Sequence, residues 1–169
     1  STSYELAYRD PWFLDKPLLF GTSVYNTTRK YSAFDRKALG FDVLLGKSLS
    51  EYWKTDVTYN FESVTIHNIS PNASARVKDQ EGKKVTSSIT PAIARDSRNS
   101  FFDPHTGSRN VIHVTYAGLG GDNFFLKIGV DSSWFFPVTE ETTLAFRGRY
   151  AQATGMFNKP LPLYERFYV

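Results

Sequence analysis

The sequence has 169 residues and a formal net charge of +3, and it contains no cysteine. This length suits a single domain with a sizeable core. The Lys and Arg residues are scattered and form no basic stripe, so nucleic acid is not an expected partner. Without cysteine the chain has neither a disulfide framework nor a thiolate zinc site. No run reaches the roughly 18 apolar residues of a membrane-spanning helix, which excludes a helical membrane protein.

The composition favours strands whose two faces differ in polarity. Aromatic residues make up 16% of the chain, yet the mean hydropathy is negative. The two facts together fit alternating apolar and polar residues better than continuous apolar segments. The alternation predicts strands over 2–9, 18–28, 38–47, 53–65, 86–96, 108–118, 123–136 and 142–154. Several of them reach the roughly 9–11 residues that a tilted strand needs to cross a bilayer.

The segment 124–136, FFLKIGVDSSWFF, shows this alternation most clearly. One face is apolar or aromatic and is broken only by Ser132, while the other carries Lys127, Gly129 and Asp131. Such a strand has one side for an apolar environment and one for a polar environment. Alternation alone does not tell a protein core from lipid, because the period is the same in a soluble barrel and in a membrane barrel.

The connections between the predicted strands alternate between two rims. One rim holds mostly short turns with Pro, Gly, Asp or Ser, at 10–17, 47–52, 96–107 and 137–141. The other rim holds 27–37, the long polar segment 66–84, the tight segment 118–123 and the terminal segment 155–169. We therefore predict an all-β fold, an antiparallel up-and-down meander of about eight transmembrane strands of an outer-membrane β-barrel.

The distribution of aromatic residues favours an apolar face that contacts lipid. Six aromatic residues gather at the rim of the short turns: Trp12, Phe13, Tyr52, Trp53, Trp134 and Phe136. A second group, Tyr25, Tyr59, Phe124 and Tyr150, lies nearer the opposite rim. Two such belts are expected at the two membrane–water interfaces. The middle of each apolar face is also nearly free of charge, and a Lys or Arg there would cost about 2–4 kcal/mol. The alternative is a soluble lipocalin-like calyx, whose apolar face points inward.

Charged residues of both signs occupy the polar faces and would line the interior of such a barrel. They are Asp42, Lys54, Asp56, Glu62, Lys127, Asp131, Arg147 and Arg149. We expect them to fill the interior as a lattice of salt bridges. The alternative is that they line a conduction path.

No catalytic, metal or cofactor site is predicted. His105 lies beside Asp103 and Ser108 in sequence, but a Pro- and Gly-containing turn does not hold a nucleophile, a base and an orienting group in place. His67 and His113 have no partner at metal-ligand spacing. The GLGGDN segment lacks the following helix that a phosphate-binding loop needs.

Four segments carry motifs that follow one another in a known order. Residues 4–41 contain a strand, a DPWF turn and a returning strand, and residues 46–66 contain a short turn and the next strand. Residues 96–118 contain a D…P…G-x-R turn between two strands, and KPLPLYERFYV (159–169) contains a P-x-Y-x-x-F segment. In this order and spacing they resemble the barrel of the BamA family, the outer-membrane assembly factors also called bacterial surface antigens.

The resemblance implies that the chain is the middle of a larger barrel of about sixteen strands, matching the fourth to the eleventh. Both ends look cut. The family's periplasmic POTRA domains and its first and last strands, which form a lateral gate, would lie outside residues 1–169. The stem of the family's long external loop, which folds back into the barrel, corresponds to Leu163, Tyr164, Glu165, Arg166 and Phe167. The alternative is that these residues are a severed loop stem that is disordered.

By this resemblance the parent protein is a non-enzymatic factor of the bacterial outer membrane that folds and inserts β-barrel proteins. Its partners would be outer-membrane lipid, unfolded β-barrel clients and accessory assembly lipoproteins. The alternatives are a polypeptide-secreting or autotransporter-assembly relative, a small stand-alone barrel, or the soluble calyx. An isolated fragment would have open strand edges, so we expect it to close on itself or, more favourably, to pair edge to edge with another copy.

Overall fold

The computed structural model describes residues 1–32, 34–72, 75–78, 81–162 and 165, with the side chains of 76 and 77 left out. The elements are β1 (Thr2–Asp10), the 3-10 turn η1 (Phe13–Asp15), β2 (Leu18–Lys30), β3 (Asp35–Ser48), β4 (Trp53–His67), α1 (Ala75–Lys78), β5 (Gly82–Asp96), β6 (Gly107–Gly121), β7 (Phe125–Pro137) and β8 (Thr143–Gly155). No helix in the described ranges is both long enough and apolar enough to cross a membrane.

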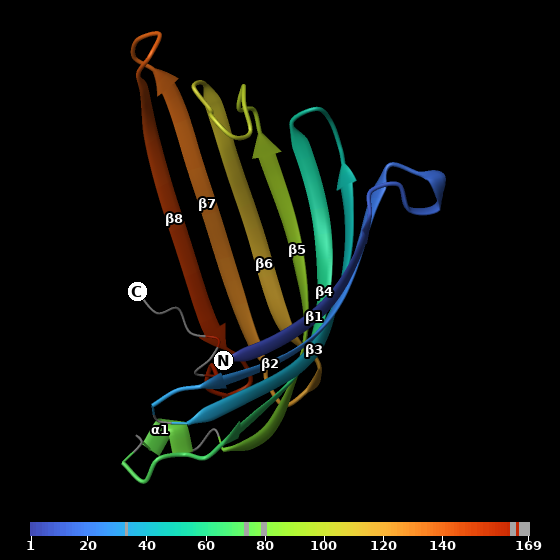
Figure 1. Cartoon of the computed structure of the whole chain (residues 1–169), viewed down its shortest axis with the longest axis vertical. Coiled ribbons are helices and arrows are strands. Elements are labelled where there is room, and N and C mark those ends of the chain that lie inside the picture. Colours follow the sequence, from blue (N-terminus) through green and yellow to red (C-terminus); the bar gives the residue numbers. More distant parts are fainter. Residues whose placement is uncertain (33, 73–74, 79–80, 163–164, 166–169) are drawn as a thin grey trace.

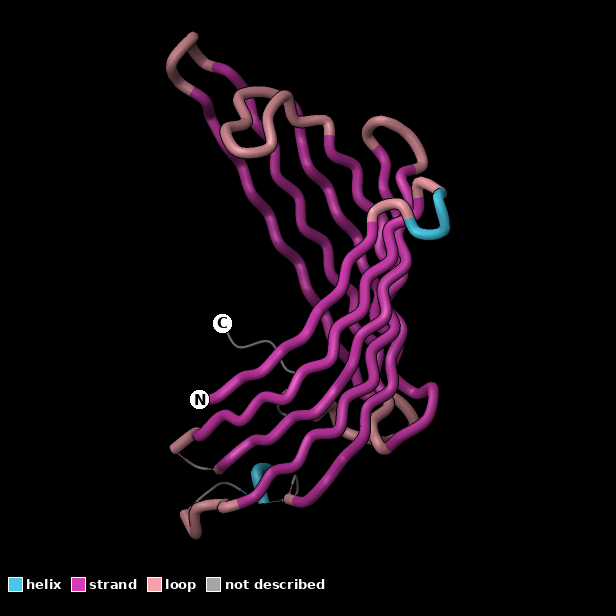
Figure 2. The backbone as a smooth tube through the Cα atoms, turned by 45° about the vertical axis from the view of Figure 1, so that its right-hand side comes forward, coloured by secondary structure: helices cyan, strands magenta, loops and turns pink. Residues whose placement is uncertain are grey.

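The strands form one 8-stranded antiparallel sheet in the order β1 to β8, so each strand pairs with the next one along the chain. The sheet twists and curves into a trough (Figures 1 and 2). Within the described residues no ladder joins β1 to β8, so the sheet is open. The predicted all-β antiparallel meander is confirmed.

The two rims differ as the sequence predicts, but β1 to β6 are longer than predicted. The turn rim carries residues 11–17, 49–52, 97–106 and 138–142. The described residues of the loop rim are 31–32, 34, 68–72, 75–78, 81 and 122–124. The predicted loop 27–37 is wrong in extent, because β2 continues to Lys30 and β3 begins at Asp35. Backbone pairing continues there through Thr, Arg and Lys residues, which carry no apolar alternation to reveal a strand.

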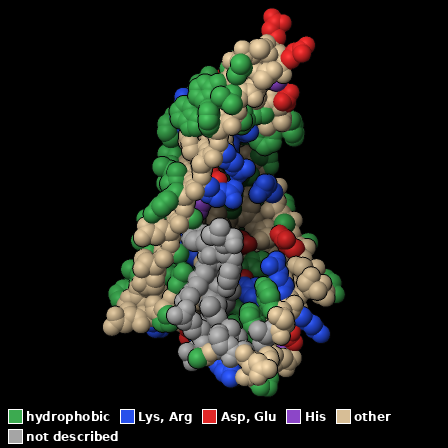
Figure 3. All heavy atoms as spheres, turned by 90° about the vertical axis from the view of Figure 1, so that its left-hand side faces the viewer, with side chains coloured by type: hydrophobic (Ala, Val, Ile, Leu, Met, Phe, Trp, Pro, Cys, Tyr) green, Lys and Arg blue, Asp and Glu red, His purple; other side chains and the backbone are tan. Residues whose placement is uncertain are grey.

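The convex face of the trough carries the apolar side chains. Strand register places Val24, Phe41 and Phe61 side by side on this face, and the rings of Phe41 and Phe61 stack at 5.6 Å. Leu6 is 79% exposed and Phe146 is 57% exposed, although both belong to regular strands. Figure 3 shows hydrophobic side chains along the outside of the trough and Lys and Arg side chains gathered in its hollow. This arrangement suits a sheet whose convex face is solvated by lipid, and it does not fit a calyx.

The buried core is small. Among the described residues, Ala38, Val64 and Ile66 form a cluster on the concave side near the loop rim, with Phe34 and Ile69 packed against them, and Ala117 and Phe125 are buried as well. The expectation of a sizeable core, which was based on chain length, is therefore wrong. Many large apolar side chains are exposed on the convex face instead.

Candidate functional site

A hydrogen-bonded cluster on β2, β3 and β4 occupies one half of the concave face. The Tyr25 hydroxyl donates to Glu62 Oε2 at 3.0 Å and accepts from Asn60 Nδ2 at 3.0 Å. Asn60 also donates to Asp42 Oδ1 at 2.6 Å, and Arg36 forms an ion pair with Glu62 at 2.9 Å. Tyr25, expected in the second aromatic belt, therefore points to the concave side.

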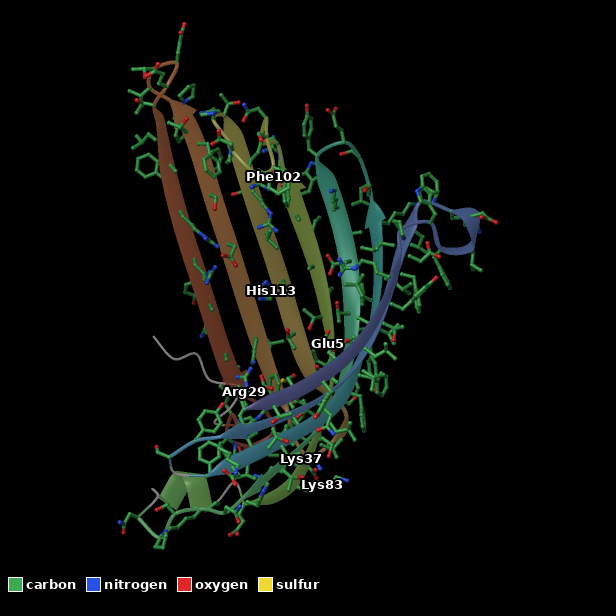
Figure 4. All side chains as sticks on the ribbon, in the orientation of Figure 1. Glu5, Arg29, Lys37, Lys83, Phe102 and His113 are labelled. Carbon is green, nitrogen blue, oxygen red and sulfur yellow. The ribbon has the colours of Figure 1, made fainter. Side chains whose placement is uncertain are left out.

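Glycine at position 40 makes this cluster geometrically feasible. Gly40 is paired with Tyr25 across the β2–β3 ladder, and a Cβ there would lie 2.5 Å from the Tyr25 hydroxyl. The tyrosine ring thus lies flat across the neighbouring strand and reaches the residues of β4. The same relation recurs where His113 of β6 lies over Gly129 of β7, with the added Cβ at 2.3 Å from the imidazole. Figure 4 shows His113 within the trough.

A second charged cluster lies on β7 and β8. Asp131 accepts a hydrogen bond from Arg149 Nε at 2.7 Å, and Arg147 lies 3.8 Å from the same carboxylate oxygen. Asp131 and Arg149 are directly paired across the ladder, so the register brings the opposite charges together. Two cations face one carboxylate, which leaves this part of the concave face positively charged.

The segment after β8 returns to the concave face. Lys127 of β7 forms an ion pair with Glu165, and the Phe125 ring lies 5.1 Å from the same ammonium. The amide of Met156 donates to the Phe124 carbonyl at 2.9 Å, which holds the beginning of the segment against β7. Of the predicted loop stem, Glu165 is thus placed in the trough. Leu163, Tyr164, Arg166 and Phe167 lie outside the described residues.

Lys54 and Asp56 occupy the concave side of β4 near the turn rim. Both line a shallow hollow together with Trp12, Pro17 and Gly46. Trp12, which was expected in the aromatic belt at the turn rim, thus lies beside the concave-face charges of Lys54 and Asp56. Phe13 instead stacks on Phe20 at 4.5 Å, and Tyr52, Trp53, Trp134 and Phe136 are each between 41% and 48% exposed.

The turn between β5 and β6 is held together by charge and by backbone contacts. Arg98 donates from Nε and Nη2 to the two Asp96 oxygens at 2.8 and 2.7 Å, and Arg109 Nε lies 3.9 Å from Asp96. The side-chain hydrogen bond to Asp96 raises the pKa of the Arg98 guanidinium above its usual value. Figure 4 marks Phe102 at this turn, where it is 94% exposed. Asp96 and Arg109, two positions of the D…P…G-x-R motif, thus meet in space.

The histidine of this turn has a structural environment. His105 Nδ1 lies 2.6 Å from Thr143 Oγ1 and Nε2 lies 3.2 Å from Asp103 Oδ2, so it links the turn to the start of β8. Ser108 is engaged elsewhere, with Arg95 and Ser97. Within the described ranges, no three His, Asp or Glu side chains come together as a metal site.

Comparison with known proteins agrees with this fold and with these motifs. Residues 1–169 match the Omp85 superfamily domain. The chain belongs to the Omp85 superfamily. The Omp85 chain is 22% identical over 169 residues to the outer membrane protein assembly factor BamA of Nitratidesulfovibrio vulgaris, covering 99% of this chain and 21% of that protein. It is 26% identical over 171 residues to the mouse sorting and assembly machinery component 50 homolog, covering 99% of this chain and 36% of that protein.

A solved structure supports the same fold for this Omp85 chain. BamA from Haemophilus ducreyi lacking POTRA domains 1–3 superimposes with a TM-score of 0.85 at 19% identity, over 98% of this chain and 35% of that one. The resemblance to a BamA-type barrel and the location in the bacterial outer membrane are thus confirmed. The chain spans about a fifth to a third of the length of these relatives.

Proposed function

We propose that the chain is the middle part of the barrel of an outer-membrane protein assembly factor, which folds β-barrel proteins and inserts them into the outer membrane. The chain's share of that activity is to form a wall of the barrel with a lipid-facing convex side and a charged interior. The observation that carries the proposal is the agreement over 98% of the chain with a BamA barrel, at a TM-score of 0.85. The bacterial relative named as an outer membrane protein assembly factor and the mouse relative named as a sorting and assembly machinery component support it.

We further propose that the chain corresponds to the middle strands, the fourth to the eleventh, of a barrel of about sixteen strands. The open edges of β1 and β8 fit this placement, because each edge strand has one paired neighbour and would pair with another strand in a closed barrel. The interior charges then form a lattice of salt bridges and hydrogen bonds that fills the barrel wall's inner side. Six of the eight predicted residues fit this role, because Asp42, Glu62, Lys127, Asp131, Arg147 and Arg149 have polar partners on the concave face.

We also propose that residues after β8 form the stem of a loop that folds into the barrel. The ion pair between Lys127 and Glu165 supports this proposal, since it joins that segment to an inward-facing strand. Unfolded β-barrel clients and accessory lipoproteins are the proposed partners of the whole protein. Such a factor contributes binding and orientation rather than covalent chemistry.

The test is reconstitution of the complete parent protein in liposomes, with its accessory lipoproteins. A urea-denatured β-barrel client is added, and its folding is followed by heat-dependent electrophoretic mobility. We expect folding to be faster than in empty liposomes and the client to become inserted. Absence of acceleration would refute the assembly function. Transfer of a soluble polypeptide into the vesicle lumen, without client insertion, would favour the secretion relative.

A further inference from the structure

One row of residues on the convex face is polar, although the face around it is apolar. Ladder register joins Trp53, Arg95, Asn110, Ser132 and Gly148 at one level across β4 to β8. We call Arg95, Asn110, Ser132 and Gly148 the polar row. The sequence analysis did not identify Arg95 as a convex-face residue, although it lies two positions after Ile93 and therefore on the same face of β5.

The polar row lies between an apolar row and a row that is serine on β6 and aromatic on β7 and β8. On the side of the membrane middle the next convex residues are Ile93, Ile112, Val130 and Tyr150, paired in the same register. On the side of the turn rim they are Ser108, Trp134 and Phe146. Adjacent rows on one face are about 7 Å apart, since a strand rises about 3.4 Å per residue. Arg95 is the residue before the end of β5, so the row lies near the turn rim.

Hydrogen bonds connect the row into one continuous chain. Trp134 Nε1 donates to Ser132 Oγ at 2.8 Å, and Ser132 donates to Asn110 Oδ1 at 2.6 Å. Asn110 Nδ2 donates to Ser108 Oγ at 3.1 Å, and Arg95 Nη1 donates to the same oxygen at 3.3 Å. The indole N–H of Trp134 thus points along the face to a polar group instead of toward water.

The positive charge of Arg95 is not balanced by a carboxylate. In the described part of the chain its guanidinium donates to the hydroxyls of Ser97 and Ser108, and no ion pair includes it. A guanidinium has five N–H donors in a planar fork that fits phosphate oxygens. An anion bound on this face would therefore supply the counter-charge that the Arg95 guanidinium lacks among the described residues.

The row also opens toward β8. A Cβ at Gly148 would have no heavy atom within 4 Å. Phe146 and Tyr150 flank this glycine on the same face and are 57% and 58% exposed. Side-chain size falls from Arg95 through Asn110 and Ser132 to Gly148. The row therefore has a cation at one end and, at the other, an uncovered glycine flanked by two aromatic rings.

We propose that the polar row binds the phosphodiester of a phospholipid in the leaflet at the turn rim. Arg95 contacts the phosphate, Asn110 and Ser132 contact polar oxygens of the headgroup or glycerol, and hydrocarbon lies over Gly148 between Phe146 and Tyr150. A membrane-facing surface makes lipid the occupant, because Trp53 and Ile93, the neighbours of Arg95 on this face, are 41% and 39% exposed. This binding site goes beyond the assembly function and does not depend on it.

The test measures lipid retention by native mass spectrometry of the full-length protein in a neutral detergent, titrated with dioleoylphosphatidylglycerol. We expect Arg95→Gln to weaken binding about tenfold, because a charge-assisted hydrogen-bonded contact is lost. Gly148→Val retains the charge and should also weaken binding, because its side chain occupies the open space over the glycine between Phe146 and Tyr150. Arg109→Gln is the matched control, since Arg109 lies beside the same turn on the concave face. It should bind like the wild type.

Competition separates the lipid from other occupants. Dioleoylglycerol, which lacks the phosphate, should not bind at this site, and inorganic phosphate should not displace the phospholipid. Displacement by inorganic phosphate would overturn the proposal in favour of a free-anion site. Equal lipid binding by Arg95→Gln and wild type would also overturn it, as would an equal loss in Arg109→Gln. Loss of accessory lipoprotein binding with unchanged lipid binding would assign the row to a protein partner instead.

Discussion

At the scale of single residues, glycines on the concave face decide which interior contacts form. Gly40 has the phenol of Tyr25 lying across it, and an added Cβ would also lie 2.8 Å from the Phe61 carbonyl oxygen. We predict that Gly40→Ala displaces Tyr25 from Glu62 and Asn60 and destabilises the barrel by about 1–3 kcal/mol. The measurement is the urea midpoint of the full-length protein in detergent. Gly148→Ala on the convex face has open space and should lie within about 0.5 kcal/mol of the wild type; equal effects of the two substitutions would contradict this role of Gly40.

The ion pair between Lys127 and Glu165 gives a second prediction at this scale. Glu165→Lys places two cations together, so the segment after β8 should leave the concave face more often. Hydrogen exchange of residues 156–162 should then rise up to about fivefold, as expected for a partly exposed pair worth at most about 1 kcal/mol. The exchanged pair Lys127→Glu with Glu165→Lys should restore slow exchange. Slow exchange in the single variant would show that the backbone contacts of this segment hold it without the ion pair.

At the scale of elements, the turn between β5 and β6 depends on the glycine of its motif. Gly107 has φ +93°, and a Cβ there would lie 2.1 Å from the Ser97 carbonyl oxygen. Asn99 Oδ1 accepts from the amides of His105 and Thr106 at 3.0 and 3.1 Å, so the turn has little freedom to move away. We predict that Gly107→Ala destabilises the protein by about 2–4 kcal/mol through strain and this clash.

Gly120→Ala is the matched control for the turn. Gly120 has φ +113° but open space around its Cβ position, so it shares the backbone strain without the clash. Its urea midpoint should fall clearly less than that of Gly107→Ala. An equal fall would attribute the whole effect to backbone conformation and none to the contact with Ser97.

The elements were largely predictable from sequence, whereas their contacts were not. Alternation in FFLKIGVDSSWFF gave β7 to within two residues, because each side of that strand faces a different solvent. It could not give the register, which alone sets Tyr25 opposite Gly40 and His113 opposite Gly129. Arg95 was missed for a related reason: its convex position becomes evident only when its row on the neighbouring strands is known.

At the scale of the whole molecule, the sheet has polar backbone groups at two open edges. β1 pairs only with β2 and β8 only with β7 among the described strands. The β1 edge is also thinly covered, since every residue from Thr2 to Arg9 is exposed. In lipid each unpaired N–H or C=O group costs several kcal/mol, so these edges must find partners.

The isolated polypeptide of residues 1–169 should therefore associate in detergent. Closure of eight strands on themselves would bring Arg147, Arg149 and Lys127 into an interior only just wide enough for side chains. Arg147 and Arg149 already share the single carboxylate of Asp131, so closure would crowd cations that have no further counter-charge in the described part of β8. Pairing of two copies edge to edge avoids this crowding and satisfies the same backbone groups. Multi-angle light scattering should give twice the mass of one chain or more, and replacing Ala7 and Ala151 by Pro should reduce association by removing edge N–H donors. A strictly monomeric species with slow amide exchange in β1 and β8 would instead establish closure of a single copy.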